Sequence, residues 1–129
     1  MNIPSDLKYT KTHEWAKKEG NVVTVGITDY AQKEISDVVF VELPKVGQSV
    51  AQGKAVAVVE SVKAAFDIYA SVSGKVVKAN QDIENNPGTV NEGCYGKGWF
   101  FQIEMSNAAE WDALMTAEQY QTHLSQSAH

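Results

Sequence analysis

Hydrophobic and polar positions alternate over short stretches along most of the chain. Runs rich in β-branched and aromatic residues, which are typical of strands, are separated by Gly, Pro, Asn and Asp. Strands are predicted at residues 21–27, 37–43, 55–60, 65–70, 75–79 and 99–104, with residues 48–52 as a connecting strand or loop. Many short strands at close spacing predict a mainly β fold, either a β-sandwich or a flattened barrel.

Helical signals are confined to the N-terminal third and to the C-terminal end. Thr28 is a candidate N-cap for a short helix that ends at Ile35. Farther along, Asn107 followed by Glu110 is typical of a helix start. The apolar residues that follow are spaced as one face of a helix: Trp111, Leu114 and Met115.

The C-terminal end carries one more helix signal. Thr116-Ala117-Glu118-Gln119 matches a capping box, which predicts a last short helix through Leu124. Residues 125–129 are small and polar, so we expect them to fray. A length of 129 residues is close to the usual size of one domain, and we expect a single domain over residues 1–129.

A lysine occupies a predicted hairpin tip. The runs 55–60 and 65–70 are separated by Ser61-Val62-Lys63-Ala64, which predicts a hairpin with Lys63 at or near its tip. The ε-amine of such a lysine is reachable, and it forms a stable amide with a carboxylic cofactor. From position alone, a lysine placed on a turn for solubility is the commoner explanation. Position therefore does not decide whether Lys63 carries a group.

Composition excludes several classes of function. A formal net charge of −5 and the absence of arginine disfavour nucleic acid, whose affinity comes largely from cations that neutralise phosphates. No apolar run approaches the roughly 20 residues that span a bilayer, so we expect no membrane partner. The single cysteine cannot form an internal disulfide and fits a reducing compartment. We expect a monomer in a bacterial cytoplasm, or in a mitochondrial matrix if a presequence has been removed.

Other candidate sites lack the partners that their chemistry requires. His13 begins a segment like the helical zinc signature, but position 17 is Lys17 where a second histidine is needed. Cys94 lies in the glycine-rich segment 93–98 and has no adjacent histidine to lower its pKa. We expect no metal site and no catalytic residue. A small enzyme with its site in segment 93–98 is the alternative from a different class, and no motif supports it.

Several segments resemble the blocks of one family. Val59-Glu60-Ser61-Val62-Lys63-Ala64-Ala65 resembles the lipoylation signature of glycine cleavage H proteins, and Ser73-Gly74-Lys75-Val76 occupies the position of that family's Ser-Gly turn. Further blocks are similar and stand in the family's order: Leu7-Lys8-Tyr9, His13-Glu14-Trp15, Val25-Gly26-Ile27-Thr28, Tyr30-Ala31-Gln32, Val39-Phe40-Val41-Glu42-Leu43-Pro44 and Gly98-Trp99. The resemblance runs from about Leu7 to Tyr120.

This resemblance implies a fold and a function. The fold would be a lipoyl-domain-like β-sandwich with hammerhead hairpins, and the protein a non-catalytic carrier in glycine cleavage. Lipoate would be attached covalently to Lys63 as N6-lipoyllysine. The lipoyl group would receive the aminomethyl group of glycine from the P protein, a pyridoxal-phosphate-dependent glycine decarboxylase. It would deliver that group to the T protein, an aminomethyltransferase, and electrons to the L protein, dihydrolipoyl dehydrogenase.

The resemblance also implies roles for residues near Lys63. Recognition by the lipoate ligase, or by a lipoyl/octanoyl transferase, would involve four of them: Glu60, Ser61, Val62 and Ala64. Glu14 and Asp67 match polar residues of a cleft in which the family shelters the loaded arm, and they would hold its cationic amine. As an alternative, both are solvated surface carboxylates, which is the usual state of acidic residues.

The chain departs from the family's usual residues at four positions: Glu34 where some relatives have His, Ser36 for Gly, Phe66 for Ser or Thr, and Ser71 for Pro. Phe66 lies close to Lys63, so we expect it to affect how the arm packs or how fast a ligase acts.

Two related classes of carrier are the nearest alternatives. Biotin carriers centre on Met-Lys-Met and dehydrogenase lipoyl domains on Asp-Lys-Ala, whereas this chain has Val62-Lys63-Ala64. An H-like protein that donates lipoyl groups to other enzymes, without serving glycine oxidation, stays open as the second interpretation.

Overall fold

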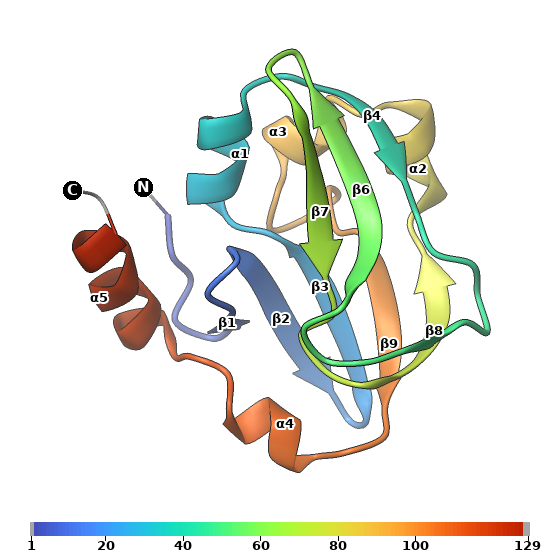
Figure 1. Ribbon diagram of the computed structural model, residues 1–129, viewed down its shortest axis with the longest axis vertical. Helices are drawn as coiled ribbons and strands as arrows, with labels where there is room; N and C mark the ends of the chain where they lie inside the picture. Colours follow the sequence, from blue (N-terminus) through green and yellow to red (C-terminus); the bar gives the residue numbers. More distant parts are fainter. Residues whose placement is uncertain (1, 128–129) are drawn as a thin grey trace.

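Two antiparallel β-sheets form the centre of the computed structural model, which describes residues 2–127 (Figure 1). The strands are β1 Lys8–Tyr9, β2 Glu14–Glu19, β3 Val22–Ile27, β4 Val38–Glu42, β5 Ser49–Val50, β6 Ala55–Ser61, β7 Ala65–Tyr69, β8 Gly74–Ala79 and β9 Phe101–Met105. The helices are α1 Asp29–Ile35, α2 Gln81–Asn85, α3 Thr89–Glu92, α4 Ala109–Asp112 and α5 Ala117–Ser127.

The two sheets have separate strand orders. The larger sheet is six-stranded, in the order β1-β2-β3-β9-β8-β5, and the smaller is three-stranded, in the order β4-β6-β7. The prediction of a mainly β sandwich is confirmed, but among residues 2–127 the strands do not close into a barrel. The outer edges of β4 and β7 therefore have no strand partner in the described chain. The turn of the β6–β7 hairpin lies at one end of the molecule (Figure 1).

The core lies between the sheets because each contributes alternate buried side chains. Val23 and Val25 of β3 and Ile103 of β9 face Val59 of β6 and Ile68 of β7 in one apolar cluster. Full burial of such side chains contributes about 1.5–3 kcal/mol each. This core fixes the base of the hairpin, while its tip projects beyond it.

Two strands and two helices were not expected from the sequence. The β1 strand has only two residues, too few to show a pattern. In β2 three buried residues are followed by three exposed ones, so hydrophobic and polar residues do not alternate along it. Helices α2 and α3 have five and four residues and no side-chain cap. The prediction that helices are confined to the N-terminal third and the C-terminal end was therefore wrong.

Helix α1 begins as predicted. The Thr28 hydroxyl accepts a hydrogen bond from the Ala31 backbone amide at 3.2 Å. The expected second helix is shorter than its apolar spacing suggests: α4 ends at Asp112, and Met115 instead pairs with Tyr9 in a β-bridge. The Glu110 carboxylate does not cap α4; it accepts hydrogen bonds from the backbone and the hydroxyl of Ser73, at 2.7 and 2.9 Å.

The last helix starts with the predicted capping box. The Thr116 amide donates to the Gln119 side chain at 2.9 Å, and the Gln119 amide donates to the Thr116 hydroxyl at 3.2 Å. Helix α5 continues to Ser127, beyond the predicted end at Leu124, while residues 128 and 129 lie outside the described chain. Fraying of residues 125–129 stays a prediction.

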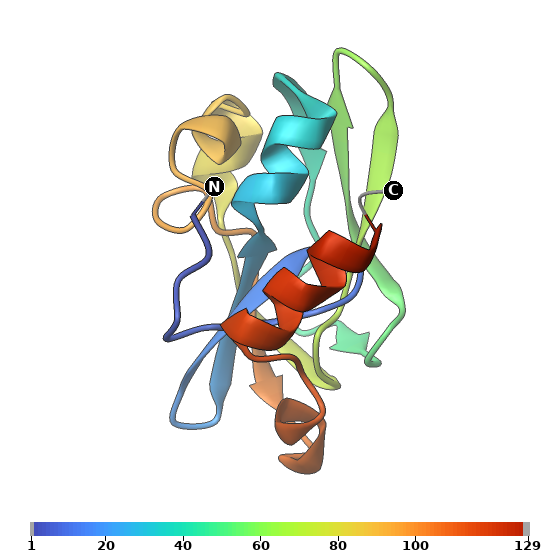
Figure 2. The same cartoon turned by 90° about the vertical axis from the view of Figure 1, so that its left-hand side faces the viewer.

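Helix α5 packs on the β1 side of the molecule, below α1 (Figure 2). The Tyr120 ring stacks on the Tyr9 ring with centroids 4.8 Å apart, and the Tyr120 hydroxyl hydrogen-bonds to the Thr28 hydroxyl at 2.8 Å. None of the helices in residues 2–127 has the length and apolarity needed to cross a membrane.

Candidate functional site

Lys63 lies on the exposed tip of the β6–β7 hairpin, where the sequence predicts it. The turn is organised by Ser61, whose hydroxyl accepts hydrogen bonds from the backbone amides of Lys63 at 3.1 Å and Ala64 at 3.4 Å. The Ser61 amide closes the turn by donating to the Ala64 carbonyl at 2.9 Å. A serine hydroxyl that bonds amides two and three residues later is a common turn device, and here it presents Lys63 outward.

The Lys63 amine points toward the end of helix α1. Its Nζ donates to the Glu34 backbone carbonyl at 3.2 Å, one residue before the helix ends at Ile35. The carbonyl groups in the last turn of a helix carry partial negative charge, which favours a nearby ammonium group. The contact is exposed, so the amine remains open to a reagent or an enzyme.

A groove of about 480 Å³ opens beside this contact, and we call it the proximal groove. One wall is β7, from Phe66 to Tyr69, and another is α1, including Tyr30 and Glu34. His13 completes it; burial lowers the pKa of this imidazole, and the neighbouring His123 lowers it further. The proximal groove therefore begins at Glu34, whose backbone carbonyl accepts the hydrogen bond from the Lys63 amine. From there it follows β7 away from the hairpin tip.

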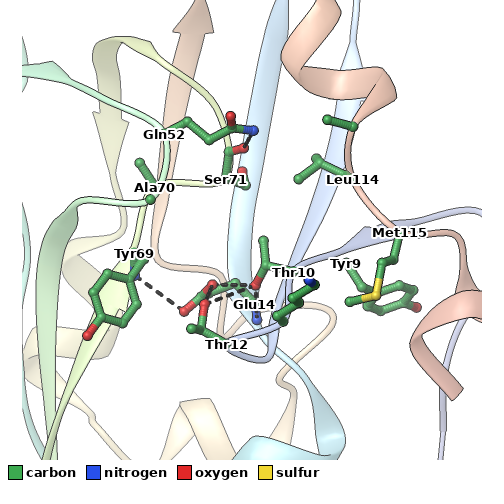
Figure 3. A pocket seen from close by; sticks show the side chains of 13 residues that line it. Tyr9, Thr10, Thr12, Glu14, Gln52, Tyr69, Ala70, Ser71, Leu114 and Met115 are labelled. Carbon is green, nitrogen blue, oxygen red and sulfur yellow. Dashed lines mark hydrogen bonds between the residues drawn. The ribbon is translucent and has the colours of Figure 1, made fainter. Parts of the chain in front are cut away.

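A second groove, of about 390 Å³, continues from Tyr69 past Ala70 and Ser71, and we call it the distal groove (Figure 3). The two grooves share three lining residues: Lys11, Thr12 and Tyr69. Much of the distal groove is apolar, with Leu114 and Met115 on the side opposite β7. Together the grooves make one path along the hairpin.

Glu14 belongs to the distal groove and is only 1% exposed. Its Oε1 accepts hydrogen bonds from the hydroxyls of Thr10 and Thr12, and its Oε2 accepts one from the Tyr69 backbone amide at 3.3 Å (Figure 3). Burial raises the pKa of the Glu14 carboxyl, and the three hydrogen bonds partly offset that rise. The carboxylate is thus held in place before any ligand arrives.

The predicted cleft pair is divided between the two grooves. Asp67 lies on β7 and lines the proximal groove, whereas Glu14 lines the distal one. Asp67 is exposed, as expected for a solvated surface carboxylate. Glu14 is buried, so the alternative that both residues are surface carboxylates was wrong for Glu14. Glu60, Val62 and Ala64 are exposed around Lys63, and Ser61 is half-buried in the turn.

The residues that hold Glu14 are not singled out by the sequence. Thr10 and Thr12 precede β2 in a turn, in which the His13 amide donates to the Thr10 carbonyl and His13 has a φ of 72°. Such a turn leaves no regular periodicity to read. The Tyr69 amide comes from a strand 55 residues away, and no local pattern could have predicted its contact with Glu14.

The remaining candidates do not form a second site. Cys94 is buried, and burial raises the pKa of its thiol to about 11. Its backbone carbonyl accepts a hydrogen bond from the Trp15 indole at 2.8 Å, which anchors segment 93–98 to the body. Within residues 2–127, His, Cys, Asp and Glu side chains do not gather in threes that could hold a metal ion.

Comparison with known proteins gives the family. The family model described as glycine cleavage H-protein matches residues 7–127. The chain belongs to the glycine cleavage H-protein family. Glycine cleavage system H proteins from Thermus thermophilus and Carboxydothermus hydrogenoformans are 54% and 53% identical to it. The first comparison covers 99% of this chain and 100% of the relative, and the second covers 92% of each.

A solved H protein confirms the fold. The crystal structure of a glycine cleavage system H protein from Mycobacterium marinum superposes with a TM-score of 0.85 at 34% identity, over 98% of this chain and 100% of that one. The family resemblance inferred from the sequence blocks is therefore confirmed over nearly the whole length. H proteins are the lipoyl carriers of glycine cleavage, and this chain is such a carrier.

Proposed function

We propose that Lys63 is the lysine to which lipoate is attached, and that the two grooves shelter the resulting arm. The supporting observation is the Lys63 amine itself, exposed on the hairpin tip and in contact with the residue at which the proximal groove begins. The residues present fit the group, because the grooves offer mainly apolar walls with a few polar positions. When bound, lipoate supplies a dithiolane that takes up the aminomethyl cargo and later yields two electrons.

Each residue near the path has one task in this proposal. Ser61 keeps the turn that presents Lys63, and Glu60, Val62 and Ala64 are exposed beside it for recognition by a lipoate ligase or a lipoyl/octanoyl transferase. Asp67 in the proximal groove and Glu14 in the distal groove offer carboxylates to a cationic amine. Because Glu14 is already fixed by three donors, it can bind a cation without reorganising.

The carrier performs no chemical step of its own in this proposal. It serves the P, T and L proteins of glycine cleavage in turn, as a monomer in the bacterial cytoplasm. A tethered group moves between partners without being released, which replaces separate diffusional encounters by local delivery. The bacterial source of the relatives supports the location.

Intact mass with peptide mapping tests the attachment. The protein is coexpressed with a lipoate ligase in the presence of lipoate, as wild type, as Lys63→Arg and as Lys54→Arg. Lys54 is an exposed lysine just before β6, at the other end of the same hairpin, so it is a matched control. We expect one adduct, on Lys63, in wild type and Lys54→Arg and none in Lys63→Arg. A wild type without an adduct, under conditions that modify a known acceptor, would refute the proposal.

A further inference from the structure

The His13 imidazole lines the proximal groove and has no task in the proposed function. It is half-buried, and its Nδ1 lies 2.9 Å from the Tyr120 hydroxyl oxygen. That oxygen is 2.8 Å from the Thr28 hydroxyl, which also accepts a hydrogen bond from the Ala31 amide at 3.2 Å. Side chains from the turn before β2, from helix α5 and from the N-cap of α1 therefore form one hydrogen-bonded chain.

The direction of this chain follows from its buried hydrogens. Thr28 and Tyr120 are completely buried, so each hydroxyl hydrogen needs an acceptor within the protein. Among residues 2–127 the acceptor for the Thr28 hydrogen is the Tyr120 oxygen, and Tyr120 therefore donates its own hydrogen to Nδ1 of His13. Nδ1 is thus an acceptor without a hydrogen. A neutral imidazole in this position carries its hydrogen on Nε2.

The surroundings keep this imidazole neutral. Burial lowers the pKa of His13, and the His123 ring, with its centroid 5.9 Å away, lowers it further. Glu34 acts in the opposite direction, but its carboxylate is hydrogen-bonded to the Tyr30 hydroxyl. Protonation of Nδ1 would also reverse the chain and leave the buried Thr28 hydrogen without an acceptor in the described residues. The titratable groups that face His13 or share its groove are Lys11 of its own turn, Tyr30 and Glu34 of α1, Asp67 of β7, and Tyr120 and His123 of α5.

The backbone and a neighbouring ring fix the orientation of the imidazole. His13 has a φ of 72°, in the left-handed region that residues with a Cβ seldom adopt. Its amide donates to the Thr10 carbonyl at 3.2 Å, and its carbonyl accepts from the Thr28 amide at 3.0 Å. The Tyr30 ring lies against the imidazole with centroids 4.8 Å apart. A side chain held from several directions in an unusual backbone conformation is typical of a preorganised binding group.

The Nε2 hydrogen of His13 is open to a ligand. Within residues 2–127 the His13 side chain makes its hydrogen bond through Nδ1, and Nε2 has no acceptor there. An oriented, half-buried N–H donor in a mainly apolar groove favours a ligand that brings an acceptor atom. An acyl arm on Lys63 brings such atoms, because its amide carbonyl oxygen and the sulfur atoms of lipoate accept hydrogen bonds.

We infer that His13, with its hydrogen on Nε2, is a positioning residue that donates a hydrogen bond to an acceptor atom of the acyl group on Lys63. The inference rests on the proposed attachment of lipoate to Lys63. Glu14 and Asp67 are proposed to hold a cation, so they serve an arm that carries an amine, whereas an N–H donor also serves the empty arm. Helix α5 lines neither groove, yet through Tyr120 it determines which nitrogen of His13 carries the hydrogen.

Nitrogen-15 NMR of the whole carrier tests both parts of the inference. The labelled protein is studied unmodified, octanoylated on Lys63 and lipoylated on Lys63, and intact mass with peptide mapping verifies each adduct. His13→Gln identifies the His13 signals among those of the three histidines. In the unmodified carrier we expect a neutral His13 with its hydrogen on Nε2. On acylation we expect the proton on Nε2 to move downfield and to exchange more slowly with water, while the Nδ1 signal stays unchanged.

The two acyl groups identify the acceptor atom. Octanoyl has the amide carbonyl but no sulfur, so a shift in both acylated forms assigns the carbonyl oxygen. A shift in the lipoylated form alone assigns a sulfur atom. The indole N–H of Trp99, which lines neither groove, is the internal control and should not move. A hydrogen on Nδ1 in the unmodified carrier, or unchanged His13 signals in both acylated forms, would overturn the inference.

Alkylation of the reduced lipoyl arm by iodoacetamide measures how well the arm is held. Asparagine tolerates a left-handed backbone but is too short to replace Nε2, whereas the amide nitrogen of glutamine can take the place of Nε2. We expect His13→Asn to speed alkylation about fivefold, as for the loss of one neutral hydrogen bond, and His13→Gln to stay within about twofold of wild type. Intact mass follows the reaction.

Tyr120→Phe tests the chain without changing His13. The variant keeps the ring that stacks on Tyr9 and removes the hydroxyl that donates to Nδ1. We expect NMR to show the His13 hydrogen on either nitrogen, and alkylation to be faster than in wild type but slower than in His13→Asn. Thr122→Val, on the exposed side of α5, is the control for loss of a hydroxyl from this helix and should react as wild type does.

The outcomes separate the inference from the proposed function. The dispersion of the amide spectrum verifies that each variant is folded, and Tyr120→Phe keeps the test decisive if a change at position 13 prevents folding. Wild-type alkylation rates in His13→Asn and Tyr120→Phe would overturn the inference while leaving the attachment to Lys63 intact. A wild type that is never acylated on Lys63 would refute the proposed function together with the inference.

Discussion

Lys63 stands at the hairpin tip, beside the start of the groove path, and Glu14 lies near Tyr69, where the two grooves meet; the surroundings of the two residues are opposite in kind. The Lys63 amine is exposed and donates to one backbone carbonyl. The Glu14 carboxylate is 1% exposed and accepts from two hydroxyls and one amide. A group that must be reached by an enzyme gains from an open, lightly held position. A group that must hold a cation gains from being fixed in advance.

The contrast predicts that the surroundings of Glu14 are more costly to disturb than those of Lys63. Thr10→Val with Thr12→Val removes both hydroxyl donors and leaves a buried carboxylate with the Tyr69 amide alone. We expect the free energy of unfolding at neutral pH to fall by about 2–4 kcal/mol, measured by urea denaturation. The control is Thr122→Val on the exposed side of α5, which should change it by less than about 0.5 kcal/mol. A loss below 1 kcal/mol in the double variant would mean that the hydroxyls do not support the carboxylate.

Removing charge along the path should shorten the life of the loaded carrier. In the aminomethyl-loaded protein, Glu14→Gln should speed the release of ammonia about tenfold, because a charge-assisted hydrogen bond is worth about 1.5–3 kcal/mol. Asp67→Asn should speed it only a few-fold, since Asp67 is exposed and its charge is screened by solvent. Ammonia release is followed with time, with Glu118→Gln on α5 as control. An unchanged rate in both path variants would reject their role.

The stability of the protein should carry a pH signature from Glu14. Its pKa in the folded protein lies above its usual value of 4.5, so the folded state binds this proton more tightly than the unfolded chain. The contribution of Glu14 to stability is therefore present at low pH and is lost as the pH rises from 4.5 through the raised pKa.

The glutamine of Glu14→Gln does not titrate, so this variant does not lose stability at position 14 as the pH rises. The unfolding free energy of the variant relative to wild type should increase across this window and then level off, by ~1.4 kcal/mol for each unit of pKa shift. Urea denaturation between about pH 4 and pH 8 measures it. Parallel curves for the two proteins would contradict the assignment.

The smallest effect is expected near the Lys63 end. Ser36 follows α1 with φ 65° and ψ −153°, a backbone region that strongly favours glycine. Ser36→Gly should raise the free energy of unfolding by about 1 kcal/mol, without changing the rate at which Lys63 is acylated. Thermal unfolding measures the change in stability, and intact mass measures the rate at which Lys63 is acylated. A destabilised variant would show that contacts of the Ser36 side chain outweigh the strain.

The exposed position of Lys63 was largely predictable from the sequence, and the buried surroundings of Glu14 were not. Alternating strands around a four-residue turn placed Lys63 on a hairpin tip, since hairpins are local in sequence. The environment of Glu14 depends on an irregular turn and on an amide from a distant strand, which local periodicity does not encode. The shift in the β4–β6 register between Val38 and Phe40 was missed for a related reason: it exists only relative to β6, so the sequence of β4 alone does not reveal it.

The isolated position of the Lys63 amine also has a practical use. It is the only cationic side chain in segment 55–70, and acylation there converts an ammonium into an uncharged amide. The lipoylated and the unmodified carrier then differ by one unit in a protein whose formal net charge is −5. Anion-exchange chromatography or native electrophoresis should resolve two such species. The extent of lipoylation in a cell extract could thus be read from an elution profile, with neither a label nor an antibody.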